Sequence, residues 1–428
     1  MADRGQDWRS ILLGLASLAS ALFAFAIAGL MIIYSLPTRV RTDLSQNTPT
    51  TLQAIVIASG IIFSGAVFLP ASYYSFQRLR GKNIPDAAPN LLKPWQGIIL
   101  LLLWAGAALL AQLMVGNNIF KWFTPPLYLL AICTPVYFLI RLAGGGLNAG
   151  SRQRFWGIPA VTIALGTTLS IVAEGTMVII GLAGVAVYLS LHPEQLSVFR
   201  QFTEQFFNTS NLDSALNIAE PWLNNPFVIA LALFFFSGLT PVIEETAKSI
   251  ATWSVFDHLD SPAQGFVIGA LSGAGFGLVE SLLASATPDS SWAATLMIRG
   301  GSTMMHILTA SITGWGIAFF RSHKRISLMI GSYTLAVFLH SLWNAAVIMI
   351  VFGGLRMSSN GGPTDPVGLI LVFFGVSVLV VLCLAIPLTL GFINRWLRKH
   401  LTLPPVKSAG ESLGGIGQKP DEGLEGVQ

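Results

Sequence analysis

One stretch of this sequence decides its fold, an apolar run with charged residues in its middle: residues 227–256 read FVIALALFFFSGLTPVIEETAKSIATWSVF. The run exceeds the roughly 20 apolar residues that a helix needs to cross a bilayer. It nevertheless contains Glu244, Glu245 and Lys248. A charge such as Lys or Asp at the centre of a membrane helix costs about 2.5–3.5 kcal/mol on insertion scales. Such residues are usually retained for a site, a pathway or a buried ion pair.

The composition of the whole chain is that of an integral membrane protein. Its 428 residues are 53% hydrophobic and 10% charged, and the mean hydropathy is +0.67, whereas a soluble domain is about 25% charged. The apolar runs are continuous rather than alternating, so we predict an all-α, polytopic transmembrane helical bundle of about ten spans. The predicted spans are Ile11–Tyr34, Leu52–Tyr74, Trp95–Val115, Leu127–Ile140 (the weakest, because it is short and contains Pro135), Trp156–Tyr188, Phe227–Phe256, Phe266–Ala286, Trp292–Phe320, Ile326–Phe352 and Val367–Ile393.

The basic residues predict an orientation. Lys and Arg accumulate in cytoplasmic loops, and four basic clusters share one side if ten spans alternate, which places both termini in the cytoplasm. Arg39 and Arg41 lie in a loop on the opposite side and do not fit this orientation. The net charge of +4 then reflects anchoring in a lipid bilayer, for which we expect a prokaryotic plasma membrane, and gives no indication of nucleic-acid binding. The clusters are Arg78, Arg80 and Lys82; Arg152 and Arg154; Arg321, Lys324 and Arg325; and Arg395, Arg398 and Lys399.

A shift in composition divides the chain into four regions. Residues 1–191 hold five spans with few internal charges. Residues 192–226 are interpreted as an external amphipathic segment, lying either on the membrane interface or over the loops of the bundle. Residues 227–400 hold the remaining spans and the polar motifs. Residues 401–428 are rich in Gly, Lys, Glu and Pro and are predicted to be a disordered cytoplasmic tail.

Four successive spans carry polar motifs. They are Glu244-Glu245-x-x-Lys248, Phe276-x-x-x-Glu280, the single His306, and His340-x-x-x-Asn344. Lys248 lies one helical turn from both glutamates, so it can hold one carboxylate while the other accepts a proton from water. His340 and Asn344 share a helix face and could donate hydrogen bonds to an oxyanion. Together these groups favour hydrolysis inside the membrane.

Each motif also has a purely structural interpretation. The charges of the sixth span could form an ion pair that closes a helix interrupted by Gly238 and Pro241. His340 and Asn344 could make ordinary contacts between helices, as could His306.

For Glu280, one specific structural role competes with a catalytic role. It lies near the outer end of its span, and Arg299 lies at a matching depth in the next span, so the two could simply neutralise each other. The small residues Gly269, Gly273 and Gly277 indicate close helix packing.

The ordered set of motifs resembles the PrsW family of intramembrane proteases, which is related to the CAAX prenyl proteases and the Abi clan. The resemblance covers about Phe227–Phe352. It implies a peptidase that cleaves membrane-anchored proteins, with Glu245 activating a water and Glu244 beside it. His340 and Asn344 match the motif to which oxyanion stabilisation is ascribed in the CAAX relatives.

The resemblance leaves two points open. Glu280 stands where the CAAX relatives have a histidine, so the second group that holds the water is either Glu280 or His306. The family is often labelled metalloprotease, and Glu245, Glu280, His306 and His340 are candidate ligands for a zinc ion. No His-Glu-x-x-His spacing is present, so we expect a glutamate-dependent enzyme without an obligatory metal.

Two other classes compete with the protease. A proton- or ion-coupled transporter could use the same groups as a relay, with Glu174 as essential as Glu245. A catalytically inactive relative could bind and shield a membrane peptide. The protease interpretation predicts that Glu174 is largely dispensable.

Overall fold

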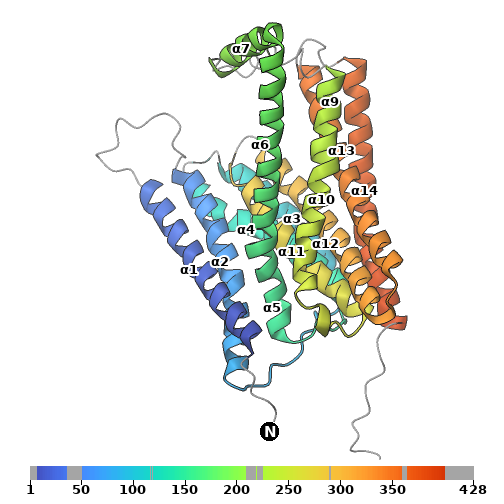
Figure 1. The fold of residues 1–428 in the computed structure, drawn as a ribbon. Coiled ribbons are helices and arrows are strands. Elements are labelled where there is room, and N and C mark those ends of the chain that lie inside the picture. The colour runs from blue at the N-terminus through green and yellow to red at the C-terminus, as the bar shows by residue number, and fades with distance from the viewer. Residues whose placement is uncertain are drawn as a thin grey trace, which may run out of the picture.

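The computed structural model describes residues 7–35, 51–115, 117, 119–208, 218, 225–288, 291–358 and 364–400. Within these ranges the chain is almost entirely helical and forms no strand (Figure 1). The predicted tail at 401–428 and the dissenting Arg39 and Arg41 lie outside the described residues, as does most of 209–224.

The N-terminal half contains five membrane-length helical segments and one surface helix. α1 and α2 form a hairpin, and α5, η2 and α6 run on as one segment that ends beneath α7 (Figure 1). The elements are α1 (Trp8–Ser35), α2 (Thr51–Leu79), α3 (Pro94–Val115), the 3₁₀ turn η1 (Phe120–Phe123), α4 (Thr124–Gly144), α5 (Arg152–Val161), the π-helical η2 (Thr162–Gly166), α6 (Thr167–Leu191) and α7 (Pro193–Asn208).

The C-terminal half holds the remaining five segments. They are α9 (Pro226–Ala232) with the π-helical η3 (Leu233–Leu239) and α10 (Thr240–Trp253), followed by the 3₁₀ turn η4 (Phe256–His258), α11 (Pro262–Ala284), α12 (Trp292–His323), α13 (Ile326–Ser358) and α14 (Pro366–His400).

The ten predicted spans are confirmed. Ten helical segments of the described chain are long and apolar enough to cross a membrane. The fourth covers Phe120–Gly144 and is longer than the expected Leu127–Ile140, because η1 precedes α4 and α4 extends to Gly144. Membrane helices tolerate an internal proline where neighbouring groups compensate for the missing backbone N–H. Length and composition make the chain an integral membrane protein.

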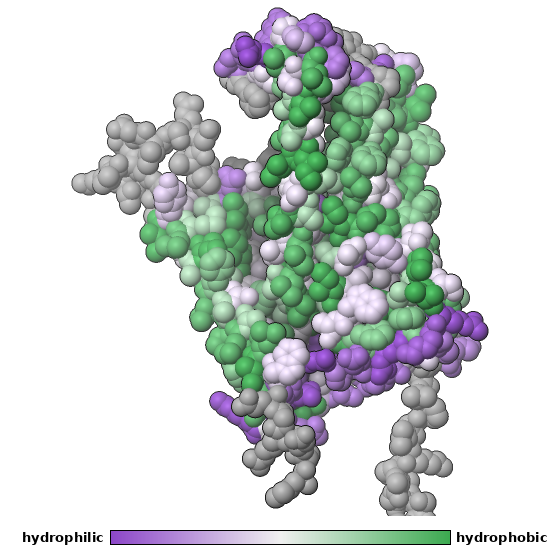
Figure 2. All heavy atoms as spheres, in the orientation of Figure 1, coloured by the Kyte–Doolittle hydropathy of each residue, from purple (hydrophilic) through white to green (hydrophobic). Residues whose placement is uncertain are grey.

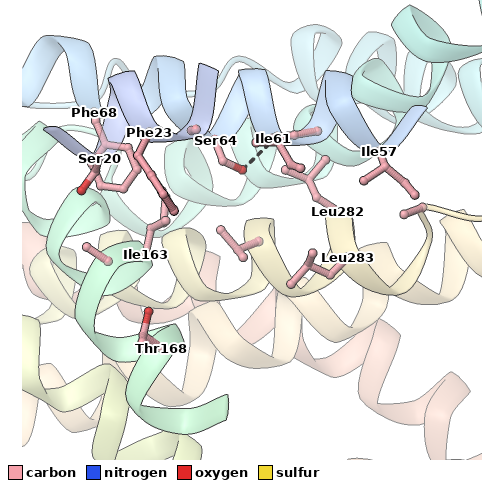
Figure 3. A pocket seen from close by; sticks show the side chains of 15 residues that line it. Ser20, Phe23, Ile57, Ile61, Ser64, Phe68, Ile163, Thr168, Leu282 and Leu283 are labelled. Carbon is pink, nitrogen blue, oxygen red and sulfur yellow. Dashed lines mark hydrogen bonds between the residues drawn. The ribbon is translucent and has the colours of Figure 1, made fainter. Parts of the chain in front are cut away.

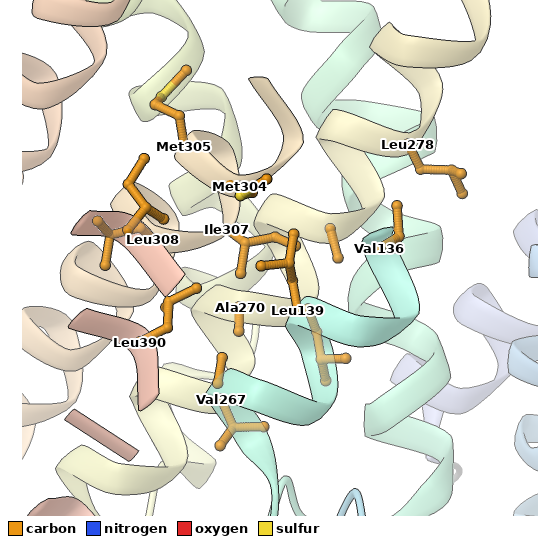
Figure 4. Close-up of a cluster of buried hydrophobic side chains, with 14 of the residues drawn as sticks. Val136, Leu139, Val267, Ala270, Leu278, Met304, Met305, Ile307, Leu308 and Leu390 are labelled. Carbon is orange, nitrogen blue, oxygen red and sulfur yellow. The ribbon is translucent and has the colours of Figure 1, made fainter. Parts of the chain in front are cut away.

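The centre of the bundle is formed by α11 and α12, which are far more buried than the other spans. Figure 4 shows side chains of these two helices meeting those of α4 and α14. Glycines allow the close approach. A Cβ at Gly269 would collide with the Ala310 carbonyl, and one at Gly273 with the His306 carbonyl. The predicted close packing is therefore present, and it fixes the backbone of His306 against α11.

Polar contacts gather at the end of the bundle where α1 begins and where Figure 2 shows a hydrophilic belt. The turn after α10 binds basic residues from three helices. Arg9 pairs with Asp257 at 3.6 Å, Arg154 donates to the His258 carbonyl at 2.9 Å, and Arg321 donates to the Asp257 carbonyl at 2.7 Å. Three helices thus bring basic residues to one end, and the prediction that this end is cytoplasmic follows from the positive-inside rule.

Candidate active site

A π-helical segment leads directly into the helix that carries the paired glutamates. Thr240 donates its backbone N–H to the carbonyl of Phe235, five residues back. In the same pattern the next N–H would reach Phe236, but the next residue is Pro241, which has none. The Phe236 carbonyl instead accepts from Asn344 Nδ2 at 2.8 Å. Asn344 therefore holds the broken end of the helix that presents Glu244.

A second π-helical segment, η2, packs on the other side of α10. Thr162 Oγ1 lies 2.9 Å from Ser272 Oγ, and Ser272 in turn donates to the Lys248 carbonyl at 2.7 Å. A Cβ at Gly166 would press on the Ala247 carbonyl at 3.1 Å. The backbone around Lys248 is consequently held from α11 and from η2. π-Helical turns occur frequently at functional sites, and two of them border this helix.

Glu245 is the most enclosed member of the cluster, with no exposed surface. Its Oε1 accepts from Lys248 Nζ at 2.6 Å and from Thr309 Oγ1 at 3.0 Å, and it lies 2.8 Å from His340 Nδ1. These donors come from three different helices. The network assigns the Nδ1 proton of His340 to this bond, which leaves His340 Nε2 with a free lone pair.

Glu244 faces the nitrogen atoms of the two histidines. Its Oε2 lies 3.6 Å from His340 Nε2, 3.8 Å from His306 Nδ1 and 3.8 Å from Lys248 Nζ. These separations exceed hydrogen-bond length, and Oε2 is buried with no hydrogen-bond partner in the structure. A buried acceptor without a partner is costly and indicates a place where water or an ion is held.

Glu280 contacts both Arg299 and His306. Its Oε1 pairs with Arg299 at 2.8 Å, which confirms the predicted match in depth. Its Oε2 lies 2.5 Å from His306 Nε2, while His306 Nδ1 lies 2.8 Å from Lys248 Nζ. A continuous chain of contacts thus connects Arg299, Glu280, His306, Lys248 and Glu245.

Six of the seven expected site residues lie together in the structure, and two of the expected contacts differ. The spacing allowed Lys248 to hold either carboxylate, and the resemblance left Glu245 free to activate the water, whereas the close contact of Lys248 is with Glu245 at 2.6 Å. The cause is the direction in which each side chain points from α10. The i,i+3 separation brings Glu245 next to Lys248, whereas Glu244 points toward α12 and α13. Asn344 was expected beside His340 at an oxyanion, and its amide instead donates to Phe236 in η3.

Glu174 is not part of this network. It is half-buried on α6, and Ser170 of the same helix donates to its Oε1 at 2.6 Å. A cavity of about 320 Å³ between α1, α2, α11 and the start of α6 is lined by apolar side chains with a few hydroxyl groups, and no ionisable residue lines it (Figure 3). Neither feature competes with the cluster as the reactive centre.

Three hydroxyl groups in the site were missed by sequence reasoning. Ser302 and Thr309 flank His306 on α12, with Ser302 Oγ 3.3 Å from His306 Nε2 and Thr309 bonded to Glu245. Ser272 holds the Lys248 backbone. The first two occupy positions four before and three after His306, a helical spacing that could have placed them on the same face.

The cluster fits a divalent metal ion. Ligand atoms of Glu244, His306 and His340 all lie within 4.8 Å of one another, and three Glu or His ligands are typical of a catalytic zinc site. Each histidine also has its other nitrogen next to a glutamate, Glu280 or Glu245, the arrangement that orients metal-bound histidines. In this structure Lys248 Nζ lies against His306 Nδ1, so the ammonium group and a metal would compete there.

The comparisons agree with this geometry. The family described as PrsW family intramembrane metalloprotease matches residues 206–386, while residues 1–205 lie outside the match. No curated protein and no solved structure matches the chain. Residues 206–386 contain every member of the glutamate, histidine and lysine cluster. The region that builds the cluster is therefore similar to the PrsW family of intramembrane metalloproteases.

Proposed function

We propose that this chain is an intramembrane endopeptidase that hydrolyses peptide bonds of membrane-anchored proteins at the buried cluster. One observation carries the proposal: Glu244 Oε2 is buried, has no hydrogen-bond partner, and lies 3.6–3.8 Å from His340 Nε2, His306 Nδ1 and Lys248 Nζ. A water placed among these atoms would be within reach of a base, of the free lone pair of His340 Nε2 and of a positive charge. That is the arrangement required to activate water for attack on a carbonyl.

The two adjacent glutamates have different roles in this proposal. Glu244 contacts the reacting water. Glu245 positions Lys248 and His340 through its Oε1, which is already engaged by three groups. The family resemblance alone assigned the water to Glu245, whose Oε2 is likewise buried without a hydrogen-bond partner. The position of Glu244 Oε2, 3.6–3.8 Å from both histidines and Lys248, favours exchanging the two roles.

A metal ion would be held by Glu244, His306 Nδ1 and His340 Nε2. Zinc bound by three such ligands lowers the pKa of a bound water to about 7 and polarises a carbonyl. Glu280 and Glu245 would keep the two imidazoles oriented. Lys248 would retain its contact with Glu245 and move away from His306.

The negative charge that develops on the attacked carbonyl needs a stabilising group. The ammonium group of Lys248 is the nearest cation to Glu244. Asn344 acts indirectly, because its amide holds the Phe236 carbonyl and so fixes the start of α10.

The test is cleavage of co-expressed single-span membrane proteins by wild type and by Glu244→Gln, His340→Ala and Glu174→Gln. We expect loss of product in the first two variants and retained product in the third, which is a matched intramembrane carboxylate outside the cluster. Equal activity of Glu244→Gln and wild type would refute the role of Glu244. An ion or proton flux that disappears in Glu174→Gln would instead favour a transporter.

A further inference from the structure

A second cavity, separate from the reactive cluster, lies between α12, α13 and α14. It is an open groove of about 510 Å³ with Phe266 of α11 in its lining. Leu308 and Leu339 also line it, two residues after His306 and one before His340. The groove therefore borders the helices that carry both histidines, although the cluster itself takes no part in it.

The length of the groove suits a single alkyl chain. Along α14 its lining runs from Leu382 to Leu397, a distance of about 22 Å at 1.5 Å per residue. This length is half of a bilayer that measures about 40–45 Å with its headgroups. The length of the groove is therefore that of one leaflet of the bilayer.

The lining is almost wholly apolar, with Thr389 as the one polar side chain among the lining residues of the described chain. One end reaches the basic face of the bundle. There Trp396 stacks on His400 with ring centroids 5.3 Å apart. Aromatic side chains of this kind mark the level of lipid headgroups.

Positive charge surrounds that same end. Lys399 lies three residues after Trp396, on the same helix face and one turn nearer the surface. Arg395 lies four residues before Lys399, on the preceding turn of the helix. Both side chains are exposed. On the opposite wall, Trp315 contacts Phe319 at 5.2 Å, and Phe319 stacks on His323 at 4.1 Å.

We propose that this groove binds one acyl chain of an anionic glycerophospholipid, with the headgroup against Lys399 and Arg395. Charge complementarity selects the headgroup, and the apolar lining selects the chain. The lipid packs against Leu308 and Leu339, and so stabilises the helices that present His306 and His340. This proposal does not depend on the protease activity.

Native mass spectrometry of the full chain in detergent tests the proposal, with dioleoyl-phosphatidylglycerol and dioleoyl-phosphatidylcholine as probes. We expect one tightly retained phosphatidylglycerol per chain and weaker binding of phosphatidylcholine. Ala385→Trp fills the groove and should abolish this binding. The control Leu384→Trp adds the same ring at a neighbouring position that is 65% exposed and does not line the groove, so binding should persist.

A surface variant keeps the test valid if Ala385→Trp fails to fold. Lys399→Gln should weaken phosphatidylglycerol binding about fivefold, the factor that corresponds to about 1 kcal/mol per basic residue near an anionic surface. Lys82→Gln, at another of the predicted basic clusters, should leave binding unchanged. Equal retention of the two lipids, equal binding by Ala385→Trp and Leu384→Trp, or no effect of Lys399→Gln would each overturn the proposal.

Discussion

Neutralising Glu245 should destabilise the fold, whereas neutralising Glu244 should impair only catalysis. Glu245 and Lys248 have 0% and 1% of their surface exposed, and they are joined at 2.6 Å. Removing one partner of a buried ion pair costs about 3–5 kcal/mol, because the other charge remains buried without compensation. Glu245→Gln should therefore lower the melting temperature by roughly 6–10 °C, at about 2 °C per kcal/mol for a large chain.

Glu244→Gln provides the matched control for this experiment. Its Oε2 has no hydrogen-bond partner to lose, and its distance to Lys248 is 3.8 Å, so the melting temperature should stay within about 1–2 °C of wild type, the scale of an ordinary substitution. The assay is thermal unfolding of the purified chain in detergent, with cleavage measured on the same samples. Equal destabilisation by both substitutions would refute the division of roles between the two carboxylates. Adding Lys248→Met to Glu245→Gln should restore part of the lost stability, because both charges are then absent.

Three further outcomes are expected. Gly273→Leu should prevent folding or strongly lower the melting temperature, because its side chain would collide with the His306 carbonyl, whereas Gly331→Leu, at an open position, should be tolerated. If a metal is held by Glu244, His306 and His340, a chelator should abolish cleavage and added zinc should restore it, while a chelator-resistant activity would exclude an essential exchangeable metal. Arg356 donates to Asp365 at 2.6 Å and holds the pKa of that carboxyl below its ordinary value. This stabilisation is present above pH of about 4 and is lost as the pH falls through the folded-state pKa, so melting temperatures of wild type and Asp365→Asn should differ at pH 7 and converge in acid.

Much of the fold was predictable because a bilayer limits the choices. Long apolar runs without internal water must form helices, so all ten spans followed from composition alone. The order of charged motifs on consecutive spans also predicted that Glu245, Lys248 and His340 lie together, and in the structure they are in contact. Their shared depth follows from helix geometry and short loops.

The pairing of side chains inside the cluster was not predictable in the same way. Sequence spacing permits Lys248 to reach Glu244 or Glu245, and only the packing of α10 against α12 decides between them. The role of Asn344 depends on the π-helical register of η3, which sequence periodicity does not reveal. Thr309 was overlooked because a single hydroxyl on an apolar helix carries little signal without its partner.

The contacts of Glu245 mean that stability and catalysis cannot be separated at this site by activity measurements alone. Its partners Lys248, Thr309 and His340 come from α10, α12 and α13, so the same bonds that orient the reacting groups also fix three helices relative to one another. Loss of cleavage in a Glu245 variant would follow equally from a missing base and from a displaced His340. Glu244 makes no such bonds through Oε2. Loss of cleavage in a Glu244 variant therefore reports on the reaction itself. The residue that contacts the water is therefore identified by an inactive variant that remains as stable as wild type.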